Sequence, residues 1–329
     1  MESFRYEQSK TVQSALAAGA TQSGKKFVAG GTTLIDLMKL EVEKPPLLVD
    51  INRLPLAQVE RTGDGGVKIG AMVRNSDLAN HELIKQQYLV LSQALLSGAS
   101  PQLRNMATTG GNLLQRTRCY YFRDIAYSAC NKRNPGSGCA AMDGFNRIHA
   151  ILGTSEHCIA THPSDMAVAM MALEAVVHTE GSGGAREIPL HQFYKLPGST
   201  PQIENVLEPN ELITFVTLPA LAEGTRSQYL KLRDRASYEF ALSSAAVVVT
   251  LEGDRIQRAR VALGGVGTVP WRSREAEEAL EGKPAKDDTF RNAAKAALAA
   301  ARPLHDNAFK VNLAQLCLRR ALSNVTKQS

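Results

Sequence analysis

Four of the five cysteines lie close together in the sequence and are candidates for a metal centre. Cys119, Cys130, Cys139 and Cys158 fall within 40 residues, with ten, eight and eighteen residues between them. None of these spacings is the short Cys-x2-Cys found in zinc fingers and bacterial ferredoxins. The residues alone therefore leave three interpretations open: unrelated structural cysteines, two disulfides, or the ligands of a metal centre.

The sequence around these cysteines favours a metal centre. The stretch Asn134–Gly138 (Asn-Pro-Gly-Ser-Gly) is incompatible with a regular helix or strand, so this loop needs something to order it. Between Arg116 and Cys139, five basic residues stand against one acid, a net charge of +4. That charge would stabilise an anionic four-thiolate iron–sulfur cluster. It would stabilise four thiolates on zinc equally well, and a basic stretch is also typical of a solvated loop.

The fifth cysteine, Cys317, belongs to a different pattern. Phe309, Leu313, Leu316 and Cys317 follow the i, i+4, i+7, i+8 spacing of one helix face. We therefore predict that Cys317 is a core residue and not a metal ligand.

Two glycine-rich segments could bring the backbone close to a ligand. The apolar stretch Phe27–Ala29 predicts a strand that runs into Gly30-Gly31-Thr32-Thr33, and a helical pattern begins at Leu34. A strand, a glycine turn and a helix in this order present backbone N–H groups to phosphate. The second segment, Ala107–Leu113 (Ala-Thr-Thr-Gly-Gly-Asn-Leu), follows a helical pattern that ends near Ala99, and its small residues permit close approach of a ligand.

Further elements must position these segments. His162-Pro163-Ser164-Asp165 opens a helix, in which Asp165 suits the first turn and the methionines form a core face. We predict a domain boundary near residues 220–225, after which the character of the sequence changes. The remaining predicted strands are Leu47–Ile51, Val67–Met72, Ser227–Arg235, Ala241–Leu251 and Val261–Leu263, and the predicted helices are Ser273–Glu281, Thr289–Ala301 and a terminal helix.

Composition and missing motifs exclude several classes of protein. The 329 residues are 44% hydrophobic and 21% charged, as in a globular protein of about two domains. We expect no membrane span, because no apolar run approaches ~18 residues, and no signal peptide, because the first ten residues are charged. Aromatic residues are only 5%, which disfavours a platform for single-stranded nucleic acid. The motifs of P-loop NTPases, α/β-hydrolases and HExxH metalloproteases are absent, so electron transfer fits better than hydrolysis.

Taken together, the motifs resemble the FAD-binding subunit of the xanthine dehydrogenase family of molybdenum hydroxylases. The resemblance covers essentially the whole chain and is carried by Ala29–Thr32, Arg104–Leu113, Asp165 and Tyr229–Leu232. It implies an α+β fold, with an FAD-binding domain of the vanillyl-alcohol oxidase type followed by a smaller α+β C-terminal domain. The implied domains are residues 1–222, with subdomains of about 1–55 and 56–222, and residues 223–329.

The resemblance also implies a role for individual residues. The backbone of Val28, Ala29, Gly30, Gly31, Thr32, Thr33 and Leu34 would hold the FAD pyrophosphate. Thr108, Gly111 and Asn112 would form a second FAD loop, and Asp165 would hold the polar edge of the cofactor. Ile159 and Ile213 would pack on the flavin ring. Lys231 would lie near the flavin, although a surface lysine on a strand is an equally good interpretation of that position.

A cysteine-containing insertion separates this chain from most of that family. Residues 116–158 stand where most members run almost directly from the Gly-Gly-Asn segment into the Ser-Asp helix. The insertion resembles those of three-subunit bacterial aldehyde oxidoreductases and of 4-hydroxybenzoyl-CoA reductase, and is closest to the former. The resemblance implies that Cys119, Cys130, Cys139 and Cys158 bind a [4Fe–4S] cluster, either as an electron relay or to order the insertion.

The implied function is electron transfer within a larger complex. A large subunit with a molybdenum cofactor would oxidise the aldehyde with water, and a small [2Fe–2S] subunit would pass the electrons to FAD on this chain. The implied location is the periplasm, reached by folded export with a partner subunit, and the alternative is the cytoplasm. Two rival interpretations are a four-cysteine zinc module that binds nucleic acid, which leaves the glycine segments unexplained, and a self-standing flavin oxidase, for which no acid–base residues are evident.

Overall fold

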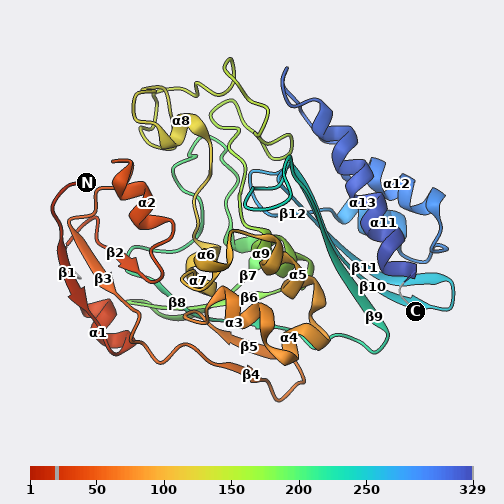
Figure 1. Ribbon diagram of the computed structural model, residues 1–329, viewed down its shortest axis with the longest axis horizontal. Helices are drawn as coiled ribbons and strands as arrows, with labels where there is room; N and C mark the ends of the chain where they lie inside the picture. Colours follow the sequence, from red (N-terminus) through yellow and green to blue (C-terminus); the bar gives the residue numbers. More distant parts are fainter. Residues whose placement is uncertain (19–21, 328–329) are drawn as a thin grey trace.

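The computed structural model describes residues 1–18 and 22–327, and it begins with a small parallel sheet. Strands β1 (Arg5–Gln8), β2 (Lys26–Val28) and β3 (Leu47–Asp50) pair in the order β1-β3-β2. Helices α1 (Val12–Ala17) and α2 (Leu34–Lys39) connect the strands, as parallel pairing requires. Figure 1 shows this unit at the left of the molecule.

A five-stranded antiparallel sheet follows, in the order β4-β5-β8-β6-β7. Its strands are β4 (Val59–Arg61), β5 (Val67–Gly70), β6 (Val176–Gly181), β7 (Gly184–Pro189) and β8 (Leu212–Leu218). Its helices are α3 (Asn75–Asn80), α4 (Glu82–Gln87), α5 (Leu89–Ser97), α6 (Pro101–Arg104), α7 (Thr109–Leu113), α9 (Asp165–Ala172) and α10 (Leu190–Phe193). Helix α9 is buried from Met166 to Ala172, which confirms the predicted core role of its methionines.

The third sheet is antiparallel, in the order β12-β11-β10-β9. It contains β9 (Thr225–Leu232), β10 (Ser243–Glu252), β11 (Arg255–Gly264) and β12 (Trp271–Arg272). Helices α11 (Arg274–Leu280), α12 (Asp287–Ala297) and α13 (Phe309–Lys327) lie beside this sheet (Figure 1). Strand β10 has apolar residues on both faces, and both faces are buried. Val247 packs in the core that contains α13, and its neighbour Val248 packs in the core that contains α9. The third sheet is thereby fixed against the second.

The terminal helix is where the predicted buried face differs from the observed one. Cys317 is 1% exposed, as predicted, but Phe309 is 39% and Leu316 is 49% exposed. The buried face of α13 instead contains Lys310, Ala314, Cys317, Leu318, Ala321, Leu322 and Val325. The pattern of large apolar residues predicted the wrong face, because the buried face includes one lysine and two alanines.

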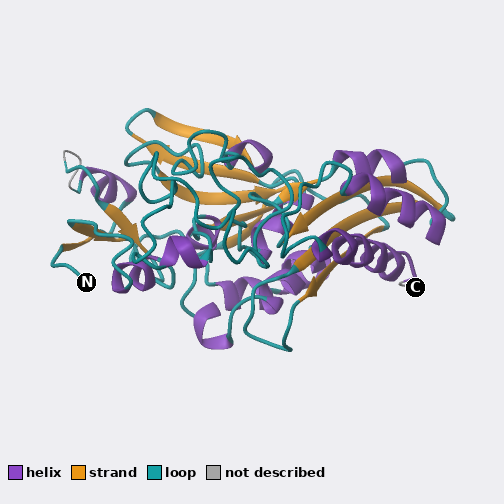
Figure 2. Ribbon diagram, turned by 90° about the horizontal axis from the view of Figure 1, so that it is seen from above, coloured by secondary structure: helices purple, strands orange, loops and turns teal. Residues whose placement is uncertain are grey.

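Residues 116–158 form an irregular layer whose only helix is the short α8 (Tyr120–Arg123). In Figure 1 this layer lies at the top of the molecule, between α2 and α13. Figure 2 shows the same loops from above and places the two termini at opposite ends. Within residues 1–18 and 22–327, no helix combines the length and the hydrophobicity that crossing a membrane requires.

Candidate functional site

The two glycine-rich segments are in direct contact. Gly31 has a φ of +69°, which glycine adopts without strain, in the turn between β2 and α2. A Cβ atom on Gly30 would overlap the carbonyl oxygen of Met106, the residue immediately before the second segment. Gly30 is therefore required for the approach of the two loops to each other.

Two residues that the sequence analysis did not identify hold these loops together. Arg74 donates to the carbonyl of Met106 through one guanidinium nitrogen and to Asn52 Oδ1, at 3.0 Å, through another. Asn52 in turn donates to the carbonyl of Ala29 at 2.9 Å. No local sequence pattern marks Arg74 or Asn52, because each acts across segments that are far apart in the chain.

The N–H groups of the two loops are used differently. In the second loop, Thr109 N and Gly110 N donate to carbonyls on the β5 side, and Gly111 N donates to Thr108 Oγ1, which caps α7. In the first loop, no hydrogen bond within the described residues uses the N–H groups of Thr32 and Thr33. The first loop therefore has backbone donors to offer an anion, whereas the second presents mainly side chains such as Asn112.

Asp165 and Lys231 form a buried ion pair. Lys231 Nζ lies 2.8 Å from Asp165 Oδ2 and 3.1 Å from the carbonyl of Ser97, and the side chains are 3% and 10% exposed. Tyr229 donates its hydroxyl to Asp165 Oδ1 at 2.6 Å, and burial followed by the Asp165 charge raises the pKa of Tyr229. The structure thus excludes the interpretation of Lys231 as a surface lysine.

A cavity of about 360 Å³ joins these elements. Of the predicted cofactor-binding residues, Thr32, Thr33, Gly111, Asn112, Asp165 and Lys231 line it. A second cavity of about 170 Å³ adjoins it, and the two share Arg118, Pro163, Asp165, Glu239 and Phe240. The second cavity extends to Cys119 and His149, so a continuous series of cavity-lining residues connects the glycine loops with the cysteines.

The remaining predicted cofactor-binding residues do not line these cavities. Ile159 and Ile213 are each 3% exposed and belong to apolar cores, the first with the cysteines and the second with β8. The two cavities are likewise not lined by the other predicted residues, Val28, Ala29, Gly30, Gly31, Leu34 and Thr108. Contact of Ile159 and Ile213 with a flavin ring stays a prediction.

The four clustered cysteines come together in one apolar region. Cys119, Cys130 and Cys158 are buried, Cys139 is half-buried, and all four line the same small space beside Phe122. Cys130 and Cys139 face each other across a bridge between two short segments, closed by Asn131 N and the carbonyl of Gly138 at 2.7 Å. All five cysteines of the chain are free thiols, so the structure does not support the disulfide interpretation.

The thiols have little tendency to ionise without a counter-charge. Burial raises the pKa of Cys119 to about 12 and that of Cys158 to about 11. The backbone N–H of Ala160 lies 3.4 Å from Cys158 Sγ as a donor. Within the described residues, no group of three or more His, Cys, Asp or Glu side chains is arranged to hold a single metal ion.

The sequence analysis missed two buried basic groups, of which one contacts a cysteine and the other lies against the backbone of the insertion. His149 Nε2 is 3.1 Å from Cys119 Sγ, and burial together with the charge of Lys310 lowers the pKa of His149 to about 4. Lys310 Nζ lies 3.1, 2.9 and 2.6 Å from the carbonyl oxygens of Ile148, His149 and Gly265. Lys310 therefore attaches the end of the insertion to the third sheet.

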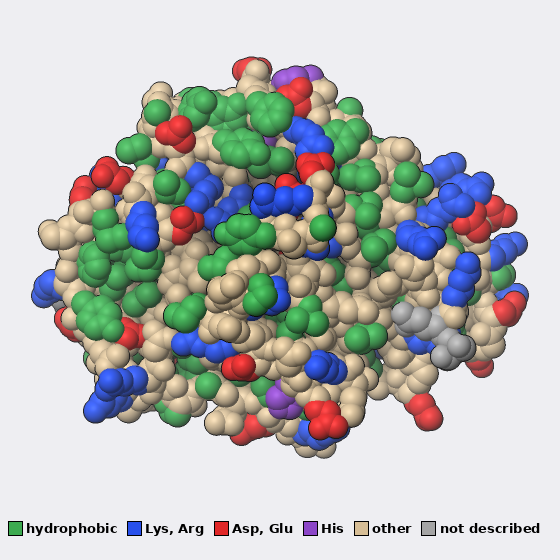
Figure 3. Space-filling view, in the orientation of Figure 1, with side chains coloured by type: hydrophobic (Ala, Val, Ile, Leu, Met, Phe, Trp, Pro, Cys, Tyr) green, Lys and Arg blue, Asp and Glu red, His purple; other side chains and the backbone are tan. Residues whose placement is uncertain are grey.

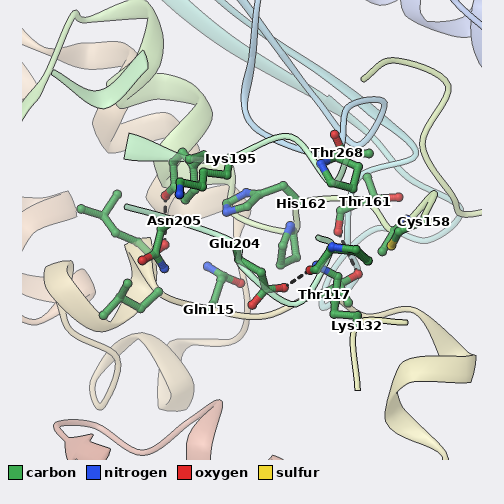
Figure 4. Close-up of a pocket in the computed structure, with 17 residues that line it drawn as sticks. Gln115, Thr117, Lys132, Cys158, Thr161, His162, Lys195, Glu204, Asn205 and Thr268 are labelled. Carbon is green, nitrogen blue, oxygen red and sulfur yellow. Dashed lines mark hydrogen bonds and ion pairs between the residues drawn. The ribbon is translucent and has the colours of Figure 1, made fainter. Parts of the chain in front are cut away.

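The basic residues of the insertion are engaged within the protein. Glu204 accepts from Arg116 Nε at 2.7 Å and from Lys132 Nζ at 2.8 Å, and Figure 4 shows Lys132 and Glu204 side by side near Cys158. Burial alone would raise the pKa of Glu204, but the charges of Arg116 and Lys132 hold it below its ordinary value. The other three basic residues also have partners within the protein. Arg118 and Arg123 pair with Asp36, and Arg133 donates to the carbonyls of Tyr121, Phe122, Asp124 and Tyr127.

This arrangement contradicts the interpretation of residues 116–139 as a solvated basic loop. Their charges hold the insertion onto α2 and onto the loop that contains Glu204. On the face shown in Figure 3, hydrophobic side chains gather over the insertion at the top. The insertion exposes Tyr120, Ile125, Tyr127 and Phe145, each about half accessible to solvent.

Comparison with known proteins supports one family along the entire chain. A family model described as the FAD binding domain in molybdopterin dehydrogenase matches residues 2–221, and the CO dehydrogenase flavoprotein C-terminal domain matches residues 228–325. The aldehyde oxidoreductase FAD-binding subunit PaoB of Escherichia coli K12 is 52% identical, with 100% of both chains covered. The carbon monoxide dehydrogenase medium chain of Hydrogenophaga pseudoflava is 30% identical over 97% of this chain and 96% of its own length. A solved structure of carbon monoxide dehydrogenase from the same organism matches with a TM-score of 0.78 at 29% identity, over 99% of this chain and 97% of that one.

Proposed function

The chain belongs to the FAD-binding subunits of the molybdenum hydroxylases, and from this premise we propose that it is the electron-transfer subunit of an aldehyde oxidoreductase. The observation that carries the proposal is the identity of 52% to an aldehyde oxidoreductase FAD-binding subunit along the whole chain. The substrate class comes from that relative, and the cavity between the glycine loops and the Asp165–Lys231 pair supplies a matching cofactor site.

The residues around the larger cavity fit FAD. The backbone N–H groups of Thr32 and Thr33 have no hydrogen-bond partner among residues 1–18 and 22–327, and such groups bind a diphosphate. These N–H groups are oriented by the turn between β2 and α2. The turn contains Gly30 and Gly31 and is flanked by Val28, Ala29 and Leu34. Gly111 and Asn112 border the cavity from the second loop, where Thr108 fixes the start of α7.

Asp165 and Lys231 contribute a carboxylate and an ammonium to the lining of the same cavity. Their mutual ion pair and the Tyr229 hydroxyl hold both groups in position, so each presents a fixed polar atom to the cofactor. FAD would supply a carrier that exchanges electrons singly with iron–sulfur clusters and in pairs with a diffusing acceptor. Asp165 and Lys231 would orient that carrier, and neither is required to transfer a proton to the aldehyde.

We also propose that Cys119, Cys130, Cys139 and Cys158 bind a [4Fe–4S] cluster. Their proximity around one space, their apolar surroundings and the N–H group of Ala160 directed at Cys158 Sγ support this assignment. The arrangement of the thiols does not suit one ion, which counts against zinc. A cluster makes a different demand, because four irons hold their cysteine ligands farther apart than one ion does.

We propose the partners that the family resemblance implies. The proposed complex contains a large subunit with the molybdenum cofactor, which oxidises the aldehyde with water, and a small subunit with [2Fe–2S] clusters. Electrons would reach FAD through the small subunit and leave to an external acceptor. We further propose that the domains are residues 1–222 and 223–329, and that the complex acts in the periplasm after export of the folded chain with a partner.

The cluster assignment is tested by iron analysis of cysteine variants. The chain should contain about four irons, and Cys139→Ser should lose most of them because metal binding and local folding are coupled. Cys317→Ser is the matched control, since Cys317 lies on the buried face of α13 and should not affect iron. Full iron occupancy in Cys139→Ser would show that the assignment is wrong.

The electron-transfer role is tested by reconstitution. The chain alone should not oxidise aldehydes, and aldehyde-dependent dye reduction should require co-expression with the molybdenum and [2Fe–2S] subunits. Turnover of an aromatic aldehyde by this chain alone would contradict the proposal and favour a self-standing oxidase.

A further inference from the structure

Arg118 connects the cysteine insertion to the cavity proposed for FAD. It lines both the cavity of about 360 Å³ and the adjoining cavity of about 170 Å³. The next residue in the chain is Cys119, one of the four clustered cysteines. The insertion therefore contributes a permanently charged side chain to a cavity that is otherwise built by residues outside it.

The guanidinium of Arg118 is held from two sides. Its Nη1 lies 3.1 Å from Asp36 Oδ2, on α2 immediately after the first glycine loop. Its carbon Cζ lies 4.8 Å from the ring centroid of Phe240, which also lines both cavities. Its buried Nε has no partner in the part of the chain that the structure describes, so these contacts do not satisfy the side chain fully.

Arg123 provides a comparison within the same insertion. It also pairs with Asp36 Oδ2, through Nη2 at 2.6 Å, and one of its nitrogens is likewise buried without a partner. Arg123 lines neither of the two cavities. The two arginines thus share an anchor and a charge, and they differ in access to the cavity.

We infer that Arg118 is an FAD-binding residue that couples FAD affinity to the state of the cysteine cluster. Its charge, fixed beside the start of α2, complements the dianionic pyrophosphate near Thr32 and Thr33. Thr117 Oγ1 donates to the carbonyl of Thr161 and accepts from Cys119 N, so the backbone from residue 117 to 119 moves as one segment. Metal at Cys119 would hold this segment, and with it the guanidinium, in the position that receives FAD.

The coupling is reciprocal by thermodynamic linkage. If the ordered insertion increases FAD affinity by some factor, bound FAD stabilises the ordered insertion by the same factor. This inference rests on the proposed FAD and cluster sites and adds a dependence of one on the other.

The first test measures FAD binding to the full chain after removal of the flavin, by quenching of flavin fluorescence. Arg118→Gln should raise the dissociation constant for FAD about tenfold or more, the usual cost of losing a hydrogen bond to a charged group. Arg123→Gln should change it by less than about twofold. ADP, which carries the diphosphate without a flavin, should lose affinity for Arg118→Gln to the same extent as FAD.

The second test compares iron-loaded and iron-free protein. Loss of iron, by Cys139→Ser or by oxidative removal from the unsubstituted chain, should weaken FAD binding in the presence of Arg118. In the Arg118→Gln background the same loss should have little further effect, because the coupled group is already absent. If Cys139→Ser does not fold, the unsubstituted chain from which iron has been removed provides the iron-free protein for this comparison.

Two results would overturn the inference while leaving the FAD site intact. One is equal FAD affinity of Arg118→Gln and Arg123→Gln, and the other is an equal effect of iron loss in both backgrounds. Unchanged ADP binding would overturn the assignment of Arg118 to the pyrophosphate. Failure of the unsubstituted, iron-loaded chain to bind FAD at all would instead refute the proposed function.

Discussion

At the scale of single residues, Gly30 matters for contact between two loops. Because a Cβ there would overlap the carbonyl of Met106, Gly30→Ala should destabilise the protein by about 1–3 kcal/mol. The FAD content should fall as well, because the two loops border one cavity. Gly183→Ala is the matched control, since no atom lies within 4 Å of its added Cβ. Urea unfolding and flavin absorbance measure both effects, and a stable Gly30→Ala variant with full FAD would contradict this role.

His149 is the residue expected to tune the proposed cluster. A thiolate can only accept, so a hydrogen bond to Cys119 Sγ at 3.1 Å requires the proton on Nε2 of His149. Loss of this donor in His149→Phe should lower the reduction potential, because donors to cluster sulfurs raise it. The equilibrium constant for reduction should fall about tenfold, or about 59 mV for one electron.

Redox titration followed by electron paramagnetic resonance measures this shift, and iron content is determined in parallel. His178→Phe is the control, because His178 stacks on Phe215 in the central sheet and does not contact the cysteines. An unchanged potential in a His149→Phe variant that retains its iron would show that the hydrogen bond has no influence.

At the scale of elements, Glu204 attaches the insertion to the body of the protein. Glu204→Gln leaves Arg116 and Lys132 without their shared carboxylate and should cost about 1–3 kcal/mol of stability. Its pKa is held below the ordinary value of 4.5, so the ion pairs contribute stability above that pH. The contribution should disappear as the pH falls below 4.5 and through the lowered pKa.

Urea unfolding as a function of pH therefore tests this anchor. The difference between the unsubstituted chain and Glu204→Gln should be largest near pH 7 and should shrink on acidification. The exposed Glu223 offers a control, since Glu223→Gln should have little effect at any pH. A difference that grows on acidification would have the wrong sign for this mechanism.

At the scale of the whole molecule, the larger cavity receives residues from all parts of the fold. Thr32 precedes α2, Gly111 lies in α7, Asp165 begins α9 and Lys231 lies in β9. FAD should therefore raise the melting temperature of the molecule as one unit, with about 2.7 kcal/mol of stabilisation at one hundred times its dissociation constant. Thermal unfolding with and without FAD measures this, with riboflavin at equal concentration as the control that lacks the diphosphate. A shift confined to one of two separate transitions would contradict the cooperative site.

Local signals in the sequence determined the family and the positions of several elements. Ser164 caps α9 by accepting a hydrogen bond from Ala167 N at 2.9 Å. Strand β10 contains a continuous run of small and branched apolar residues, as expected of a strand that is buried on both faces. The glycine turn before Leu34 likewise depends on neighbouring residues alone. Patterns of this kind are readable because their physical cause lies within a few residues.

The tertiary structure alone decided which groups meet. Lys231 and Asp165 are 66 residues apart in the chain, and Arg118 and Asp36 are 82 apart, so no spacing rule relates them. The basic stretch that resembles a solvated loop proved to be internally paired, and the face of α13 is set by Lys310 with its three carbonyl partners. In each case the cause is the packing of distant elements, which brings a charged group to its partner.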